Sequence, residues 1–519
     1  MLSTKQPVYN LLNEPWIQCV INGQIKNVGL LDFNRSINQI TKIIIPKIAN
    51  NDFPFYELAF YRFICVLYSR AINVDMYDER DAQEGITEHE IQLVEKYLLH
   101  YKNKFDIMDL NNPFMQCSKS ETQTILPDAI PNSTSFVTSF IHLPSENAIN
   151  TKSLIGYSAQ NKISCNSSKE FIKLLSEESS LSPRETVYHL LYLNSFAKCA
   201  GVAGCSSVSS TPELYVMFQG QTVGQTIQMN IIANAAEQTA PIWERDGILS
   251  YYNMIEQIDT IGYTFYPNRF CRFEYNEDLT SHNLLYAPHN FKTLNDTSKN
   301  ICKSVCEQYY QSCDRDALLK LKDGKIATLK YNRTENWLTM LMSAVINAGD
   351  EVESSNAGKE IFGGNVNLPH TINIVLYGRS ADGKSGVYQY AEKIEESVDS
   401  EIFKNAFKRA YIEKYIRFVR AQFVINKKII DKYYKLLQKV NPHSENKVPF
   451  INQQVSLYAH QKLYDLYNVL SQDTNIDENV EAIFKNIRIY TKDIIMKMLS
   501  ENILCAAQAY NSIVFGGKK

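Results

Sequence analysis

The sequence lacks the patterns that mark common catalytic and metal sites. Only 9 of its 519 residues are histidine, and neither His-Glu-x-x-His nor Gly-x-Ser-x-Gly occurs. Those patterns carry the chemistry of zinc peptidases and serine hydrolases, so neither class is indicated. Cys302, Cys306 and Cys313 form the only cysteine cluster, but a second ligand pair for structural zinc is missing, which favours free thiols. We therefore expect a protein that is not an enzyme and holds no metal or cofactor.

A leader sequence, a membrane span and a disulfide framework are also missing. The first residues have no charged region followed by an apolar one, as a signal peptide would. The most apolar helix candidate, residues 55–72, carries Glu57, Arg62 and Arg70, which predicts a buried helix. Eleven cysteines without regular spacing are typical of reduced intracellular thiols. We expect a cytoplasmic protein.

Local patterns predict a mixed fold in the larger part of the chain. Asn22-Gly23 between two short apolar runs predicts a hairpin over residues 16–28. Ser182, Pro183 and Glu185 form a capping-box pattern that begins a helix reaching about residue 198. Further helices are expected at 55–72, 87–102 and 333–348, and strands at 214–218, 261–265 and 372–377.

The composition changes near residue 395, and from there to about 508 the sequence is almost wholly helical in pattern. Breaks are expected at Pro442 and at 471–477, so three or four long amphipathic helices follow one another through short loops. We predict an α+β protein: a large mixed α/β N-terminal domain over 1–392 and a C-terminal antiparallel four-helix bundle over 393–519.

The octet Gly378–Ser385 permits two interpretations. It matches the Walker A pattern G-x-x-x-x-G-K-[ST] and follows an apolar run, so Lys384 and the backbone N–H groups would hold nucleotide phosphates. A P-loop should open a helix, however, and the residues after Ser385 are a poor helix start. The other interpretation is a polar loop that meets a different anion, such as a DNA backbone.

Positive charge is concentrated in one segment. Residues 401–440 hold eleven basic and three acidic residues, a local charge of +8 in a chain of net charge −3. Lys428, Lys432, Lys435 and Lys439 fall on one helical stripe. This pattern fits either a solvated helix face or a surface that contacts the phosphates of a nucleic acid.

A small-residue segment at 199–210 is the third candidate. Gly201 and Gly204 allow close approach of another backbone, although a flexible connector has the same composition.

Several short segments, in order, resemble the CasA-type large subunit of the type I-E CRISPR Cascade. They are Tyr9–Ile17, Asn112–Gln116, Leu181–Glu185, Met217–Gly220 and Pro241–Trp243. The resemblance covers nearly the full chain. It implies a non-enzymatic subunit that reads the protospacer-adjacent motif (PAM) of double-stranded target DNA from the minor groove, starts strand separation for the R-loop and helps recruit a helicase-nuclease. The implied partners are the crRNA, the target DNA, the helicase-nuclease and the backbone, small and crRNA-end-binding subunits of Cascade, without a membrane.

The resemblance also implies site residues. The family's glycine loop falls on Gly201 and Gly204, and its wedge loop falls on Gly383, with Asp382 before it and Lys384 after it. The family has glutamine at the wedge and this chain does not. Either Lys384 or Arg379 would part the base pair, or this chain reads the PAM differently; Gln389 lies further along than the family pattern allows.

The remaining implied contacts are with the crRNA 5′ end and with the DNA backbone. Phe140 is the best match for the aromatic residue that touches the crRNA, and Phe136 is second; an insertion follows near 145–180. The residues expected to contact the DNA backbone are Arg417, Arg420, Lys428, Lys432 and Lys435.

Overall fold

The structure is a computed structural model of the whole chain. It describes residues 8–48, 54–75, 78–121, 181–196, 214–254, 258–265, 270–275, 277–287, 314–322, 325–328, 358, 361–362, 366–381, 388–437 and 444–515. The chain forms two compact units. The first consists of Met1–Lys330 and Asn365–Glu396, and the second of Tyr331–Gly364 and Ser397–Lys519. Among the described residues no helix is long and apolar enough to cross a membrane.

The first unit opens with the predicted hairpin, which is confirmed. β1 (Ile17–Ile21) pairs antiparallel with β2 (Gln24–Val28), and β3 (Ile40–Ile44) pairs with the other edge of β1. Asn22 and Gly23 have φ of 50° and 78°, the left-handed values that a two-residue hairpin turn needs. Between β2 and β3 lie α1 (Leu30–Arg35) and the short η1 (Ile37–Gln39).

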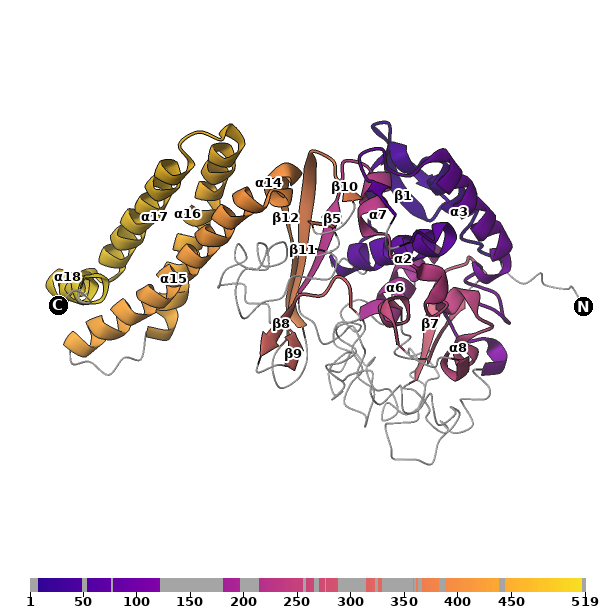
Figure 1. The fold of residues 1–519 in the computed structure, drawn as a ribbon. Coiled ribbons are helices and arrows are strands. Elements are labelled where there is room, and N and C mark those ends of the chain that lie inside the picture. The colour runs from indigo at the N-terminus through magenta and orange to yellow at the C-terminus, as the bar shows by residue number, and fades with distance from the viewer. Residues whose placement is uncertain are drawn as a thin grey trace, which may run out of the picture. The chain divides into compact units, whose positions relative to one another are not determined.

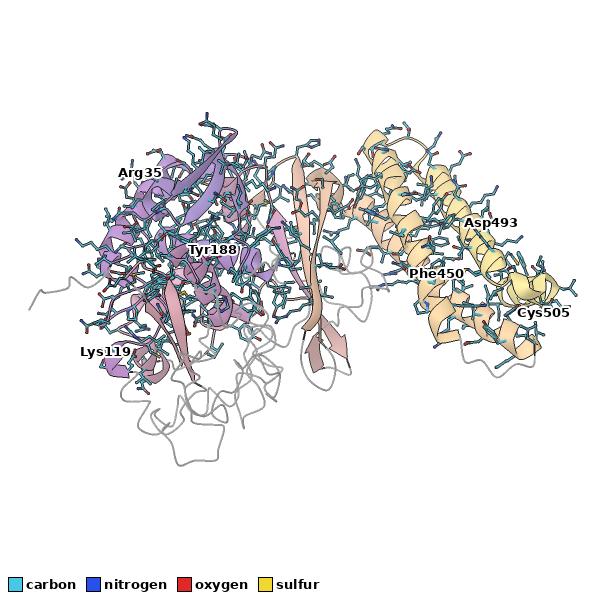
Figure 2. All side chains as sticks on the ribbon, turned by 180° about the vertical axis from the view of Figure 1, so that it is seen from behind. Arg35, Lys119, Tyr188, Phe450, Asp493 and Cys505 are labelled. Atoms are coloured by element: carbon cyan, nitrogen blue, oxygen red, sulfur yellow. The ribbon has the colours of Figure 1, made fainter. Side chains whose placement is uncertain are left out.

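α2 (Phe55–Ile72) is the central helix of this unit, as its apolar sequence predicts. Its side chains are buried on nearly all sides, and it packs against α3 (Glu88–His100), α6 (Pro183–Phe196) and α7 (Val223–Asn230) (Figure 1). Tyr188 of α6 lies inside the unit (Figure 2), with its ring 5.6 Å from Phe60 and 5.6 Å from Trp16. The burial of large aromatic side chains from α2, from α6 and from the residue before β1 therefore helps to hold the unit together.

The predicted capping box at the start of α6 is confirmed. The backbone N–H of Ser182 donates to the carboxylate of Glu185 at 2.8 Å, and the N–H of Glu185 donates to Ser182 Oγ at 3.3 Å. These bonds satisfy backbone N–H groups that a helix start leaves without partners. α3 begins in the same way, at Thr87 and Glu90.

A second sheet of three strands has the order β12-β11-β5. β5 (Leu214–Gln219) and β11 (Thr371–Ala381) are antiparallel, and both confirm predicted strands. β12 (Tyr388–Asp399) continues to Asp399, and the first helix after it begins at Ser400. The prediction that helix begins near 395 is therefore wrong by a few residues. The two units divide on this side between Glu396 and Ser397.

One predicted strand is a helix. Residues 261–264 fall in α9 (Thr260–Thr264) and Phe265 is its C-cap, because Asp259 accepts a bond from the N–H of Gly262 at 2.8 Å and so caps a helix. The expected helix at 333–348 and the insertion at 145–180 lie outside the described residues. The remaining elements of the first unit are β4 (Arg80–Asp81), η2 (Lys102–Lys104), η5 (Ala235–Glu237), η6 (Ile242–Glu244), α8 (Ile248–Met254), β6 (Phe270–Tyr275), β7 (Ser281–Ala287), β8 (Leu319–Lys322), β9 (Lys325–Thr328) and β10 (Val366–Asn367).

The C-terminal part of the second unit is the predicted helical bundle. The short α14 (Ser400–Lys404) leads into α15 (Ala406–Leu436), α16 (Ser444–Gln472), α17 (Ile476–Met498), η7 (Ser500–Asn502) and α18 (Ile503–Val514). α15 packs against α16, α17 and α18, and α17 against α16 and α18. Asp473 and Asn475, with φ of 52° and 49°, end α16 and start α17, which confirms the break expected at 471–477. The predicted α+β class with a C-terminal bundle is confirmed.

Candidate nucleic-acid interface

The pair of strands β5 and β11 positions both segments expected to touch the PAM. Gly378 of β11 is paired with Leu214, the first residue of β5. Residues 197–213 run into Leu214, and residues 382–387 follow Ala381, the last residue of β11. Because the two strands are antiparallel, both segments leave the sheet at the same end. Gly201, Gly204, Asp382, Gly383 and Lys384 themselves lie outside the described residues, as does Phe140, and their roles stay predictions.

The strand structure contradicts a P-loop in the octet Gly378–Ser385. A Walker A loop follows the end of a strand and opens a helix, whose N-terminus faces the phosphates. Here the first four residues of the octet are part of β11, and the next described element, from Tyr388, is a strand. The nucleotide-binding alternative is therefore wrong.

The structure corrects the prediction that Arg379 contacts DNA. Its side chain is fully buried, with 0% exposure. The guanidinium carbon lies 4.8 Å from the centre of the Phe55 ring, and Nη1 donates to the carbonyl oxygen of Phe196 at 3.3 Å. A side chain enclosed in this way has no surface to present to DNA, so Arg379 is a core residue.

A second arginine lies beside Arg379 in the core. Arg62 of α2 forms ion pairs with Asp314 at 2.5 Å and Asp316 at 2.9 Å, and it lies over the same two rings as Arg379, those of Phe196 and Tyr215. Burial disfavours the charged form of Arg62, but the two carboxylates outweigh this and raise its pKa above the ordinary value. Arg62 is therefore a charged residue inside the core, and sequence reasoning gave no sign of its partners.

The exposed face of α15 carries the predicted basic stripe. Lys428, Lys432 and Lys435 are exposed, whereas the opposite face packs its apolar side chains into the bundle. Lys414 pairs with Glu481 at 3.3 Å and Lys408 with Asp473 at 3.2 Å, and these acids lie on or beside α17. Within the described residues, no ion pair neutralises the three lysines of the stripe.

Two other basic residues of α15 are less accessible or lie near an acidic side chain. Arg417 is exposed and lies 4.0 Å from Glu413, while Arg420 is half-buried. Lys439, the last member of the expected stripe, lies outside the described residues. The part of α15 best able to meet phosphates is thus its C-terminal half.

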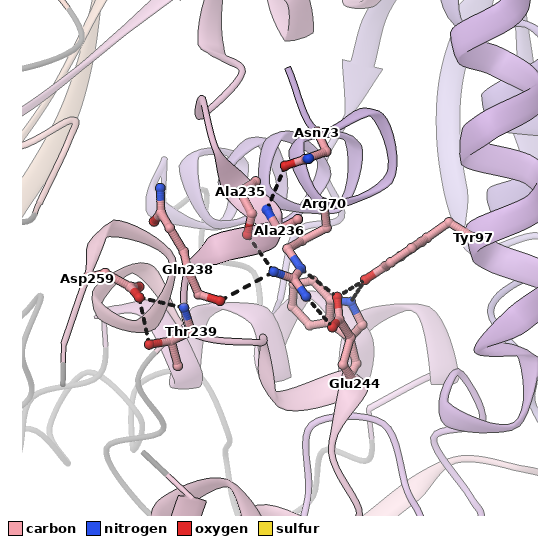
Figure 3. Close-up of polar contacts among 10 residues, drawn as sticks. Arg70, Asn73, Tyr97, Ala235, Ala236, Gln238, Thr239, Glu244 and Asp259 are labelled. Atoms are coloured by element: carbon pink, nitrogen blue, oxygen red, sulfur yellow. Dashed lines mark hydrogen bonds and ion pairs between the residues drawn. The ribbon is translucent and has the colours of Figure 1, made fainter. Parts of the chain in front are cut away.

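A polar network that the sequence did not reveal holds residues 235–244 against α2 and α3 (Figure 3). Arg70 binds both carboxylate oxygens of Glu244, at 2.8 and 2.7 Å, and also the carbonyl oxygen of Ala235. The hydroxyl of Tyr97 donates to Glu244 at 2.6 Å and accepts from Trp243 Nε1 at 2.9 Å. Each group here has a partner inside the protein, so the network is structural.

The part of the chain that the structure describes contains no group of three or more histidine, cysteine and acidic side chains placed to hold a metal ion. Cys302, Cys306 and Cys313 are not in that part.

The fold of this chain is similar to that of several solved structures. Thermobifida fusca Cse1 has the same fold, with a TM-score of 0.68 at 12% identity over 99% of this chain and 98% of that chain. Thermus thermophilus CasA (Cse1) gives 0.64 at 14% identity, over 97% and 98%. A chain of a CRISPR RNA-guided surveillance complex gives 0.60 at 12% identity, over 98% and 99%. No curated protein matches the sequence.

The family model described as CRISPR-associated protein Cse1 matches residues 10–278. That is more than half of the chain, and the solved structures extend the match in fold to nearly all of it. The chain therefore belongs to the CRISPR-associated Cse1 family.

Proposed function

We propose that this chain is the large, non-enzymatic subunit of a type I-E Cascade complex in the cytoplasm. It recognises the PAM of double-stranded target DNA, starts strand separation and helps to recruit a helicase-nuclease. The observation that carries the proposal, beside the family, is that residues 197–213 and 382–387 leave one end of the β5–β11 pair. Two segments whose flanking strand residues lie at one end of a strand pair can act on the same few base pairs.

The glycine segment supplies the minor-groove contact. Gly201 and Gly204 have no side chains to block the approach of backbone groups to the groove. Asp382, Gly383 and Lys384 enter beside the PAM, where the first base pair opens. Glycine has no side chain to insert and Arg379 is buried, so Lys384 is the residue that parts the bases. The energy required is small, because R-loop formation is a nearly balanced exchange of duplexes.

Other residues of the chain contact the crRNA and the DNA backbone. Phe140 stacks on the 5′ end of the crRNA, and the backbone, small and crRNA-end-binding subunits complete the complex. Lys428, Lys432 and Lys435 attract the DNA backbone, chiefly that of the displaced strand, and Arg417 and Arg420 extend this surface.

A PAM-library binding assay with the reconstituted complex tests the PAM site. We expect Gly201→Asp to weaken binding to all PAM sequences, because the new carboxylate repels phosphates, and Gly383→Gln to change affinity or PAM preference. Gln24→Glu is the control, since it adds the same charge at an exposed position of β2 without changing the shape of the side chain. The proposal fails if neither Gly201→Asp nor Gly383→Gln changes affinity or preference.

The salt dependence of DNA binding tests the stripe on α15. Changing Lys428, Lys432 and Lys435 together to Gln should lower the slope of log K against log salt by about 2 for a single strand and nearly 3 for a duplex. Lys485, Lys492 and Lys497 are exposed on the neighbouring α17 and give a control variant with the same change of charge. Equal slopes for wild type and the α15 variant would instead favour a helical scaffold without contact to DNA.

A further inference from the structure

We propose that Arg379 is a positioning residue that fixes the end of α6, the start of β5 and the end of β11 to one another, so that changes in the segments these elements carry, residues 197–213 and 382–387, are coupled in DNA binding. This inference rests on the proposed function and adds to it a residue that never touches DNA. We call Phe55, Phe196, Tyr215 and Arg379 the loop anchor.

The loop anchor joins the ends of both segments. Phe196 is the last residue of α6 and immediately precedes residue 197, and Tyr215 is the second residue of β5, just after residue 213. Arg379 stands in β11 three residues before 382. Its guanidinium carbon is 5.6 Å from the Phe196 ring centre and 5.8 Å from that of Tyr215. One side chain thus touches the residues that open and close the first segment and the strand that leads into the second.

The chemistry of arginine suits this role. A guanidinium is planar, so it stacks on aromatic faces and donates along fixed directions at the same time. The bond from Nη1 to the Phe196 carbonyl also places a cation at the C-terminus of α6, where the last carbonyl groups carry partial negative charge. An apolar side chain would fill the space without the cost of burying a charge, but it would not fix the direction of the α6 terminus.

The rings of the anchor are themselves held. Phe55, Phe196 and Tyr215 meet edge to face, with ring centres 5.2 to 5.8 Å apart. Arg62 lies 4.8 Å from the Phe196 ring centre and 5.0 Å from that of Tyr215. Its acid partner Asp316 also accepts, through its carbonyl oxygen, the N–H of Val216 at 2.8 Å. Because these rings are closely packed, a change at Arg379 should displace the residues at the segment ends.

Hydrogen exchange of the assembled complex without DNA tests the anchor directly. Arg379→Lys keeps the charge but loses the planar stacking and the geometry of the bond to Phe196. We expect faster exchange at the last turn of α6, at the start of β5 and at the end of β11, with β1 and β2 unchanged as the sign of an intact fold. Tyr377→Phe is the control, because it removes the 3.1 Å bond of the neighbouring strand residue to Glu57 and leaves the anchor rings in place. Faster exchange only in α6 and β5, only in β11, or in none of them overturns the proposal.

A double-mutant cycle tests the coupling on DNA. Gly201→Asp and Gly383→Gln are combined and PAM-DNA affinity is measured, first with Arg379 and then with Arg379→Lys. With Arg379 present, we expect the affinity of the double variant to differ by about fivefold or more from the value that additive effects would give, which is the lower range for coupled sites. With Arg379→Lys, we expect the two effects on affinity to be nearly additive. Additive effects in both backgrounds overturn the coupling but leave the proposed function standing. Single changes without any effect refute the PAM site, and the exchange experiment still decides on the anchor.

Discussion

Acid should destabilise the first unit through His189, a residue of α6. Its side chain is fully buried, and Nδ1 lies 2.9 Å from the hydroxyl of Tyr56 on α2. Burial lowers the pKa of His189 to about 3, from the ordinary value of 6.5. Below pH 6.5 the unfolded chain binds a proton at this residue that the native protein does not bind until about pH 3. Stability is therefore lost as the pH falls from 6.5 towards 3.

The magnitude follows from the two pKa values. At pH 5 the unfolded state gains about 2 kcal/mol from protonation of His189, and at pH 7.5 almost nothing. Urea unfolding measured by tryptophan fluorescence at these two pH values gives the difference. Trp16 and Trp243 lie in the first unit and Trp337 in the second, so the measurement is made in a Trp337→Phe background.

His189→Gln isolates the effect of this residue, because glutamine can bond to Tyr56 but does not titrate. We expect the variant to lose about 2 kcal/mol less than wild type between pH 7.5 and 5. His89 is exposed on α3, and His89→Gln should leave the difference unchanged. If His189→Gln loses as much stability as wild type over this range, the reasoning from burial is wrong.

Two further predictions concern the same unit. Arg62→Met leaves Asp314 and Asp316 buried without their cation, and we expect a loss of about 3–5 kcal/mol in urea unfolding, whereas Arg35→Met at an exposed ion pair should cost below about 1 kcal/mol. Ser182→Ala removes the capping bond at the start of α6 and should cost about 1 kcal/mol in the same assay; a loss no greater than that of an exposed serine changed to alanine would contradict the capping role.

Signals that lie within a few residues were readable from the sequence. The Asn22-Gly23 turn and the Ser182 capping box predicted β1–β2 and the start of α6, because turn and cap geometry depend only on neighbours in the chain. Residues 261–265 were mistaken for a strand because a short apolar run fits both structures, and the cap at Asp259 decided for helix. No strand was predicted for β12, because its charged residues conceal the strand pattern.

The burial of Arg379 could not be predicted from nearby residues. A charged residue in a polar octet is ordinarily exposed, and it is buried here only because Phe55, Phe196 and Tyr215 come together around it. Those rings lie more than a hundred residues away along the chain, and the sequence of the octet does not indicate that they pack against Arg379. The face of α15 was easier to predict, since a helical stripe is a property of one segment.

The burial of Arg379 also narrows how the wedge can work. Lys384 follows Ala381 by three residues, so its Cα can lie no more than about 10 Å from the end of β11, whatever conformation joins them. A lysine so close to the strand end depends for its position on β11, and β11 depends on the loop anchor. In the proposed function, a glutamine would insert by its shape, whereas the ammonium group of Lys384 would act by attracting phosphates and base edges around an opening pair. We therefore expect Gly383→Gln to restore insertion only while Arg379 holds the strand, which makes the anchor a condition for either kind of wedge.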